Sequence, residues 1–341
     1  MKVLVVDDSA LVRLKISEIL KRCGFNVFTA KDGEEMLEKI PKIDPDVITL
    51  DVKMPRMDGL TALEKMMKDK PRPVIMLSSL TYEGAKETIE ALRLGAVDFI
   101  AKPRGGIEEI AEEIVRKVKI ASTVNPNIIR LQNLRKLRGE IVRRDWKVNK
   151  EVCVIIGSST GGPSALEHVI PRLPSNFPVP VFVVQHMPPN FTRHFAERIN
   201  DISEIEVKEA EDNERVEKGV VYIAPGGKHM KLRRSLNVVR VKIFDDKPVN
   251  NVKPSIDVTA YSIAQVYGGN VVGVILTGMG EDGARGMKMI HDLGGKVIAC
   301  NEETCVVFGM PKAAIEIGAV DSIKPIFEIV EEVARFIEVV G

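Results

Sequence analysis

The chain has 341 residues, more than one hydrophobic core usually serves, so two domains of ordinary size are expected. Hydrophobic residues make up 45% and charged residues 28%, with a net charge of +1, which excludes a disordered or fibrous protein. The apolar runs are far shorter than the roughly 20 residues of a membrane helix. Two acidic residues follow only four apolar ones in MKVLVVDDSA, which argues against a secretory signal. We therefore expect a cytoplasmic protein whose four cysteines, which lack CxxC spacing, stay reduced.

The first 120 residues alternate short apolar runs with longer amphipathic stretches, the pattern of a parallel sheet with crossover helices. Strands are expected at residues 2–6, 26–29, 47–50, 74–77 and 98–101. Helices are expected at residues 10–23, 33–40, 59–68, 83–94 and 107–120. These five βα units predict a flavodoxin-like, doubly wound domain with five parallel strands over residues 1–121.

Chemically active side chains follow four of these five strands. They are Asp7, Asp8, Asp51, Ser78 and Lys102. The carboxyl ends of parallel strands meet at one rim, and crowded carboxylates repel one another unless a hard cation such as Mg²⁺ neutralises them. An aspartate after a strand is often only a helix cap, but this combination favours a magnesium site. There Asp51 would be the nucleophile toward a phosphoryl donor, with Lys102 and Ser78 binding phosphate oxygens.

The motifs VLVVDDSALVR, LDVKMPRMDGL, MLSS and FIAKP resemble those of the response-regulator receiver family, over roughly residues 1 to 120. The resemblance implies that Asp51 is the phosphoryl acceptor. It also implies that Asp7 and Asp8 form an acid pocket that holds magnesium together with Asp51 and the backbone carbonyl of Lys53.

Two further positions match the switch residues of that family, Ser78 and Phe99. The family often has threonine at the first of them, so Ser78 is a mild departure. The match at Lys102 and Pro103 implies a cis peptide bond between these two residues.

Residues 122–150 carry most of the basic excess, with eight basic and two acidic side chains. Charges interrupt any strand pattern in RLQNLRKLRGEIVRRDWK, and apolar residues recur at loosely helical spacing. A patch for nucleic acid or membrane around Trp146 is one interpretation. A solvated, partly helical linker is the one we favour.

A second alternation begins at residue 151 and predicts an α/β hydrolase-type domain, doubly wound around a mainly parallel sheet, over residues 151–341. Strands are expected at residues 152–157, 179–184, 220–224, 238–243, 271–277 and 296–299. Helices are expected at residues 164–170, 191–199, 257–267, 284–292, 311–317 and 326–340.

The segment GSSTGG, residues 157–162, fits the G-x-S-x-G nucleophile turn between a strand and a helix. Such a turn alone is weak evidence of catalysis, because glycine-rich turns also bind phosphate or form plain loops. His186 and Asp282 follow other strand runs, so a serine, an imidazole and a carboxylate are expected to meet at one rim. The order Ser159, His186, Asp282 differs from that of α/β-hydrolases. His229, and then His194, are the alternative bases.

The motifs IGSSTGG, QHMPPNFT, KPSIDV, VILTGMGEDGARGM and CVVFGMPKAA resemble the catalytic domain of chemotaxis protein-glutamate methylesterases, the CheB family. The resemblance implies that Ser159 attacks methyl esters of receptor glutamates, with His186 as base and then acid and Asp282 as its orienter. The backbone amides of Thr160 and Met279 would donate to the oxyanion. The same acyl chemistry extends to deamidation of receptor glutamines, and ester hydrolysis itself needs no cofactor.

The same resemblance implies two partners and a mode of control. The substrates would be methyl-accepting chemotaxis receptors, and the protein would approach the membrane only through these receptors. A chemotaxis histidine kinase would phosphorylate Asp51, and the unphosphorylated receiver would cover the hydrolase cleft.

Two rival functions remain open from the residues alone. A DNA-binding or protein-binding output domain would explain a receiver, but residues 151–341 hold 20 basic and 25 acidic side chains and no helix-turn-helix signature, so no nucleic-acid partner is expected. A nucleotide site at GSSTGG would need the spacing and lysine of a P-loop, which that segment lacks.

Overall fold

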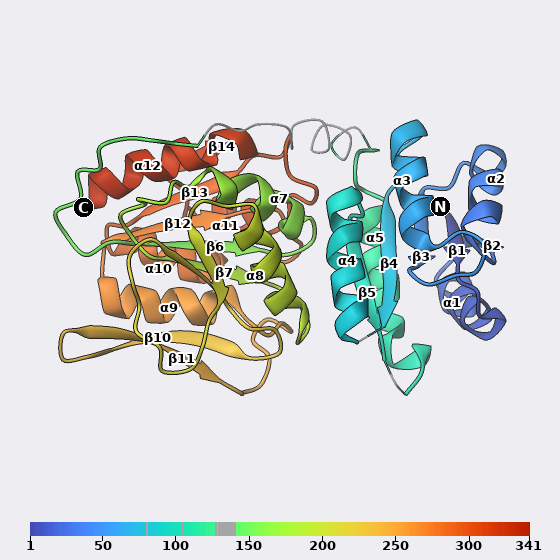
Figure 1. The fold of residues 1–341 in the computed structure, drawn as a ribbon, viewed down its shortest axis with the longest axis horizontal. Helices are drawn as coiled ribbons and strands as arrows, with labels where there is room; N and C mark the ends of the chain where they lie inside the picture. Colours follow the sequence, from blue (N-terminus) through green and yellow to red (C-terminus); the bar gives the residue numbers. More distant parts are fainter. Residues whose placement is uncertain (80, 104, 127, 129–140) are drawn as a thin grey trace. The chain divides into compact units, whose positions relative to one another are not determined.

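The computed structural model describes residues 1–341 except 80, 104, 127 and 129–140. The chain forms two compact units, Met1–Leu137 and Arg138–Gly341 (Figure 1). No helix among the described residues has the length and apolar character needed to cross a bilayer. The expected helical content of the linker falls largely on residues 127 and 129–140, outside the described residues.

The first unit is a five-stranded sheet in the order β2-β1-β3-β4-β5 with every neighbouring pair parallel. Its strands are β1 (Lys2–Val6), β2 (Asn26–Ala30), β3 (Val47–Asp51), β4 (Val74–Ser79) and β5 (Asp98–Lys102). Its helices are α1 (Ala10–Arg22), α2 (Gly33–Ile43), α3 (Gly59–Asp69), α4 (Tyr82–Leu94) and α5 (Ala111–Ala121), with the 3₁₀ turn η1 (Ile107–Ile110) before α5. This is the flavodoxin-like strand order, and the prediction of five parallel strands is confirmed.

Polar caps start four of these helices. The side chains of Ser9, Asp32, Asp58 and Thr81 each accept a hydrogen bond from a backbone N–H in the first turn. Such a cap contributes about 1 kcal/mol by satisfying an otherwise unpaired donor. These residues therefore have a local structural role, which separates them from the other aspartates at the same rim.

The second unit contains a seven-stranded sheet in the order β14-β13-β12-β6-β7-β9-β8, again parallel at every pairing. Its strands are β6 (Cys153–Ser158), β7 (Val181–Gln185), β8 (Glu206–Glu209), β9 (Val220–Ile223), β12 (Val271–Ile275), β13 (Lys296–Cys300) and β14 (Ser322–Lys324). A separate antiparallel ribbon pairs β10 (His229–Ser235) with β11 (Val238–Phe244). The expectation of a mainly parallel sheet is confirmed.

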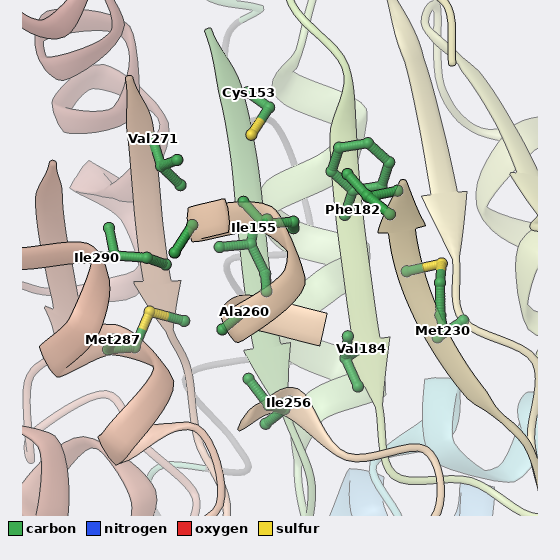
Figure 2. Packing of buried hydrophobic residues seen from close by; sticks show 14 of the residues in the cluster. Cys153, Ile155, Phe182, Val184, Met230, Ile256, Ala260, Val271, Met287 and Ile290 are labelled. Atoms are coloured by element: carbon green, nitrogen blue, oxygen red, sulfur yellow. The ribbon is translucent and has the colours of Figure 1, made fainter. Parts of the chain in front are cut away.

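Helices cover both faces of this sheet. They are α7 (Gly162–Val169), α8 (Phe191–Asp201), α9 (Ile256–Tyr267), α10 (Ala284–Asp292), α11 (Met310–Glu316) and α12 (Ile329–Val340), with 3₁₀ turns η2 (Ile170–Arg172) and η3 (Ile326–Glu328). Figure 1 shows α12 on one face and α9 and α10 on the other. Figure 2 shows the packing on the α9 side, where Ile155 of β6 lies over Ala260 and Ile290 of α10 lies between Val271 and Met287. Each large apolar side chain buried there stabilises the fold by about 1.5–3 kcal/mol.

The strand order places a topological switch point beside β6. From β6 the chain moves to β7 on one side and later returns to β12 on the other side. Where the connections that follow two adjacent strands run to opposite sides of the sheet, a crevice forms at the carboxyl ends of those strands. Open α/β sheets bind ligands in such a crevice. The same rule applies between β1 and β3 of the first unit.

Candidate functional site

The turn after β6 brings Ser159 to the carboxyl edge of the second sheet. Glycines make this turn possible, since Gly161 has φ +75° and a Cβ on it would meet Val306 Cβ at 2.5 Å. A Cβ on Gly162 would come within 2.0 Å of Gln185 Oε1. Any larger residue at either position would push the chain away from its neighbours. Ser159 is half-buried, whereas Ser158 before it is fully buried.

Gln185, the last residue of β7, ties the ends of β6 and β7 together. Its Nε2 donates to the carbonyls of Ser159 at 3.0 Å and His186 at 3.1 Å, and its Oε1 accepts from Ser158 Oγ at 2.7 Å. The side chain is 2% exposed, so these bonds satisfy groups that water does not reach. We did not predict this residue, although a polar side chain ending the apolar run VFVVQ was a signal.

His186 and Asp282 are joined by a hydrogen bond of 2.9 Å between Nε2 and Oδ2. Burial alone would raise the pKa of Asp282, but hydrogen bonds from His186, the Ile256 amide and Ser255 hold it below its ordinary value. Asp282 is therefore ionised at neutral pH and accepts, so the proton resides on Nε2. The remaining ring nitrogen, Nδ1, carries the free lone pair that a base requires.

A cradle of donors holds Asp282. Ser255 Oγ donates to its Oδ1 at 2.7 Å, Asn250 Nδ2 donates to the same oxygen at 2.8 Å, and the Ile256 amide donates to Oδ2 at 2.6 Å. Asn250 also donates to Asp257 at 2.9 Å. Burial and the charge of Asp282 raise the pKa of Asp257. Sequence reasoning missed these groups, although the motif KPSIDV contains two of the three donors.

Ser159 and His186 follow paired residues of adjacent strands, because Ser158 lies opposite Gln185 in the β6–β7 ladder. The His186 amide donates to the Ser158 carbonyl at 3.1 Å, and the Ser159 amide donates to the Thr277 carbonyl beyond β12 at 3.0 Å. Within the described part of the chain the Ser159 hydroxyl makes no hydrogen bond. The structure thus joins the imidazole to the carboxylate and sets the hydroxyl on the neighbouring strand end.

Two backbone amides were expected near the serine. Thr160 is buried, and its carbonyl accepts from Thr277 Oγ1 at 3.0 Å. The chain at 278–279 passes close to the serine, since a Cβ on Gly278 would lie 2.8 Å from Ser159 Cβ. The Met279 amide has no acceptor among the residues that the structure describes, which leaves this donor available to an incoming oxyanion.

The alternative bases have other partners. His229 is buried, accepts from the Ser255 amide at 3.3 Å on Nδ1, and lies 3.0 Å from the Lys247 carbonyl through Nε2. Both ring nitrogens are therefore engaged. His194 is also buried, with Nδ1 at 3.2 Å from Glu197.

The rim of the first sheet gathers the three predicted carboxylates. Ligand oxygens of Asp7, Asp8 and Asp51 lie within 4.8 Å of one another. Lys102 Nζ lies 2.7 Å from Asp7 and 2.8 Å from Asp51. Burial raises the pKa of Asp51 to about 6, against the opposing charge of Lys102. These hard oxygen donors fit a divalent cation of the magnesium type, which carboxylates bind well.

The remaining predicted positions surround that rim. Ser78 is fully buried at the end of β4 and donates to the Gly84 carbonyl at 3.0 Å. Phe99 is buried on β5, with the Lys117 ammonium 5.3 Å from its ring centroid. Lys53 follows β3, and its side chain reaches Glu83 at 3.2 Å and Glu87 at 3.3 Å.

One expectation at this rim is wrong. The cis peptide bond among the described residues joins Lys253 to Pro254, and the bond between Lys102 and Pro103 is not cis. The two isomers of a bond before proline differ by only about 0.5–1 kcal/mol, so surrounding packing decides between them.

Both parts of the chain match families of known proteins. The CheB methylesterase family matches residues 154–333, and the response regulator receiver domain matches residues 3–115. A protein-glutamate methylesterase/protein-glutamine glutaminase of Archaeoglobus fulgidus is 64% identical over 99% of this chain and 99% of its own length. Its counterpart in Thermotoga maritima is 45% identical over 98% of each chain. The crystal structure of the Thermotoga maritima CheB methylesterase catalytic domain is 48% identical with a TM-score of 0.54, covering 55% of this chain and 99% of that one.

Proposed function

This chain belongs to the CheB methylesterase family and carries a response regulator receiver domain, and on that premise we propose that it hydrolyses glutamate methyl esters on chemotaxis receptors, acting from the cytoplasm. The products are methanol and a receptor glutamate. The relatives named above are also glutaminases, and hydrolysis of a glutamine side chain to glutamate and ammonia uses the same acyl steps.

The hydrogen bond between His186 and Asp282 beside Ser159 carries this proposal. In the proposed reaction, Ser159 Oγ attacks the ester carbonyl while His186 Nδ1 takes its proton. The imidazolium then protonates the departing methoxide, which leaves as methanol and yields an acyl-enzyme. Water, deprotonated by His186, cleaves the acyl bond and restores the serine. Asp282 keeps the productive tautomer and stabilises the imidazolium.

The negative charge that develops on the carbonyl oxygen needs donors that are already oriented. We assign this role to the backbone amides of Met279 and Thr160. A fixed donor in a site shielded from water is worth about 2.7–4 kcal/mol of barrier lowering. The lack of any acceptor for the Met279 amide among the described residues supports its part in this role.

The receiver supplies control in this proposal. Asp51 accepts a phosphoryl group from a chemotaxis histidine kinase, with Asp7, Asp8, Asp51 and the Lys53 carbonyl holding Mg²⁺. The bound cation supplies charge neutralisation to the incoming phosphoryl oxygens. Lys102, already between Asp7 and Asp51, orients the acceptor carboxylate. Ser78 and Phe99 serve as the switch residues.

We assign the receiver role to residues 1–121, a connecting role to residues 122–150 and hydrolysis to residues 151–341. Phosphorylation of Asp51 would add about −1.5 to −2 charges at the rim of the first sheet. This charge would shift the equilibrium away from the domain arrangement in which the receiver blocks the esterase.

Methanol release from methylated receptor membranes tests chemistry and control together. We expect turnover by the wild type to rise when a small phosphodonor such as acetyl phosphate is added. Ser159→Ala should abolish turnover, whereas Asp51→Asn should keep a basal rate that ignores the phosphodonor. Ser158→Ala is the matched control, because Ser158 is buried and bonded to Gln185. A Ser159→Ala variant with wild-type turnover would refute the proposed nucleophile.

A further inference from the structure

The ribbon formed by β10 and β11 has one apolar face and one basic face. Its apolar face consists of Met230, Leu232, Val239 and Val241, which are all buried. The ribbon lies against α9 (Figure 1). The opposite face carries Lys231 and Arg233 on β10 and Arg240 and Lys242 on β11. These four residues are called the cationic face below. All four side chains are exposed or partly exposed.

The cationic face is arranged in a way that costs stability. The ladder pairs Lys231 with Lys242 and Arg233 with Arg240, so like charges lie directly opposite each other. Such pairs are destabilising in a sheet. An isolated bridge places Arg215 opposite Arg240 and adds another cation beside the pair.

Nearby groups compensate this charge only in part. Asp212 lies 3.1 Å from Lys242. Arg233 and Arg240 donate to Asn213, at 2.7 Å to its side chain and 2.8 Å to its carbonyl, but a neutral acceptor cancels no charge. The cluster stands out in a segment, residues 151–341, whose acidic side chains outnumber its basic ones by 25 to 20. The fold gains nothing from this repulsion between like charges. Its presence therefore indicates that a binding partner outside the chain uses the cationic face.

The ribbon connects directly to the candidate active site. His229, the first residue of β10, accepts from the Ser255 amide at 3.3 Å, and Ser255 donates to Asp282 at 2.7 Å. The cationic face begins two residues further along β10. A partner on this face therefore extends toward the rim that holds the reacting groups.

We propose that the cationic face docks an acidic segment of the receptor protein next to the glutamate being processed. This inference rests on the proposed function and names how the same site recognises its substrate. Hydrolysis leaves a carboxylate where an ester was, so the processed segment gains negative charge at every turnover. Arginine forks bind such carboxylates with two parallel hydrogen bonds.

The spacing of the cations suits a helical partner. Successive rows of the cationic face are two residues apart, about 6.6–6.8 Å along a strand. Acidic side chains one helical turn apart, at i and i+4, are separated by about 6 Å along a helix axis. A helix with acidic residues on one side can thus meet both rows at once.

A lipid surface fits this ribbon less well. Elements that lie on a membrane bury an apolar face in it, and the apolar face of this ribbon is already buried against α9. Among the described residues of the ribbon, Leu236 at its tip is the large apolar side chain with high exposure, at 94%. A single such residue gives little insertion energy.

The test uses the full chain with all four residues of the cationic face replaced by glutamine. Methanol release is measured with a phosphodonor on two substrates, a soluble methylated receptor fragment and N-acetylglutamate γ-methyl ester. We expect an unchanged rate on the small ester and a KM for the receptor fragment raised about tenfold, because exposed ion pairs are individually weak. The salt dependence of that KM should also flatten. Removing like-charge pairs should leave the thermal stability at or above the wild-type value.

The matched control replaces four basic residues on other elements with glutamine, each of which is paired with an acid three or four residues away in the chain. They are Lys288, Lys312, Lys324 and Arg335. We expect this variant to keep the wild-type KM for the receptor fragment. An equal KM rise in both variants, or no rise in the first, would overturn the docking proposal.

Two further outcomes separate the alternatives. Loss of binding to phosphatidylglycerol vesicles with an unchanged KM for the soluble fragment would assign the cationic face to lipid and overturn receptor docking. If the wild type hydrolyses the small ester but not the receptor ester, the proposed substrate is wrong. Fluorescence anisotropy of the labelled fragment then judges docking separately, and equal affinity of wild type and variant overturns it.

Discussion

Asp282 accepts a hydrogen bond from His186 Nε2 at 2.9 Å while three other donors hold the same carboxylate. We expect Asp282→Asn to lower kcat about 10³–10⁴-fold, because an amide facing Nε2 favours the tautomer that places the proton on Nδ1. The serine would then lack a base. Initial rates of methanol release, with circular dichroism to verify folding, check this.

Asp257→Asn is the matched control for that change. Asp257 shares Asn250 with Asp282 and is buried, but its bonds go to Asn250 and the Gly286 amide rather than to His186. Burial and the charge of Asp282 raise the pKa of Asp257, so an uncharged amide at this position removes a charge that the surroundings disfavour. We expect activity within about tenfold of wild type. Equal losses in the two variants would contradict the assignment of the orienting role to Asp282.

Gln185→Leu should damage both stability and activity. The change removes Gln185 from the Ser158 hydroxyl and from the carbonyls of Ser159 and His186. The Ser159 carbonyl keeps the Gly162 amide at 2.8 Å, whereas the other two groups each cost about 1–3 kcal/mol if they stay dry. We expect the unfolding free energy to fall by about 2–4 kcal/mol and kcat to fall about 10–100-fold, since a shift of 1 Å at a reacting group is costly. Urea unfolding and methanol release measure the two effects.

A double-mutant cycle tests whether the loss of stability comes from the broken hydrogen bond between Ser158 and Gln185 or from a general disturbance of the fold. In Ser158→Ala combined with Gln185→Leu, the unpaired hydroxyl is absent, so the combined loss of stability should be smaller than the sum of the two single losses. Additive losses would show that Ser158 and Gln185 act independently.

Asp51 should titrate well above an ordinary aspartate when no divalent cation is present. With its pKa raised to about 6 by burial, the carboxylate forms as pH rises through 6, and phosphorylation by acetyl phosphate at low magnesium should rise over the same window. Adding Mg²⁺ should move the midpoint to lower pH, because a cation favours the charged form. Carbon-13 NMR of the aspartate carboxyls in EDTA, with Asp51→Asn for assignment, measures the midpoint. A midpoint near 4 without metal would contradict the burial effect.

The same shift affects folding. A carboxyl whose pKa is raised in the folded state is destabilising when ionised, so the cost is absent below about pH 4, grows between pH 4 and 6, and is complete above pH 6. At pH 7.5 in EDTA, Asp51→Asn should therefore have an unfolding free energy about 1–2 kcal/mol higher than the wild type, as measured by urea unfolding. This difference should shrink as the pH falls. A gain that is independent of pH would point to another cause.

The fluorescence of Trp146 reports on the segment before β6. Trp146 is the one tryptophan of the chain, and its ring packs at 82° to that of Phe177 with a centroid distance of 5.3 Å. The same segment is held by the Val142 amide, which donates to the Arg172 carbonyl at 3.0 Å, and by Arg144, 3.3 Å from Glu338. We expect Phe177→Ala to shift the tryptophan emission to longer wavelength and to lower stability by about 3–5 kcal/mol. Emission that matches the wild type would show that the ring contact does not form.

The runs of buried parallel strands could be predicted because their burial on both faces leaves an uninterrupted apolar signal. Strand β6 was expected at 152–157 and spans Cys153–Ser158. Strands β8 (Glu206–Glu209), β10 and β14 were missed. Their sequences EVKE, HMKLRRS and SIK are short or charged, and such strands form because neighbouring strands offer hydrogen bonds and packing.

The residues that we propose for the site could be picked out by their positions after strand runs, but the contacts that these residues make could not be predicted. The pairing of Asn250 with two carboxylates depends on how a loop folds back over α9, and no local pattern encodes that. Gln185 gave a signal only in hindsight, as a polar residue at the end of an apolar strand. Residue type constrains what chemistry a site can perform, whereas the partners of each group come from tertiary packing.

The spread of the reacting groups along the chain has a consequence during synthesis. His186 precedes its carboxylate partner by 96 residues, and β12, which leads to that carboxylate, lies on the far side of β6 from β7. A nascent chain on the ribosome thus holds the proposed nucleophile and base long before it holds the carboxylate proposed to orient the base. Esterase activity would then appear only after nearly the whole polypeptide has been made, when the receiver to which we assign its control has already been synthesised.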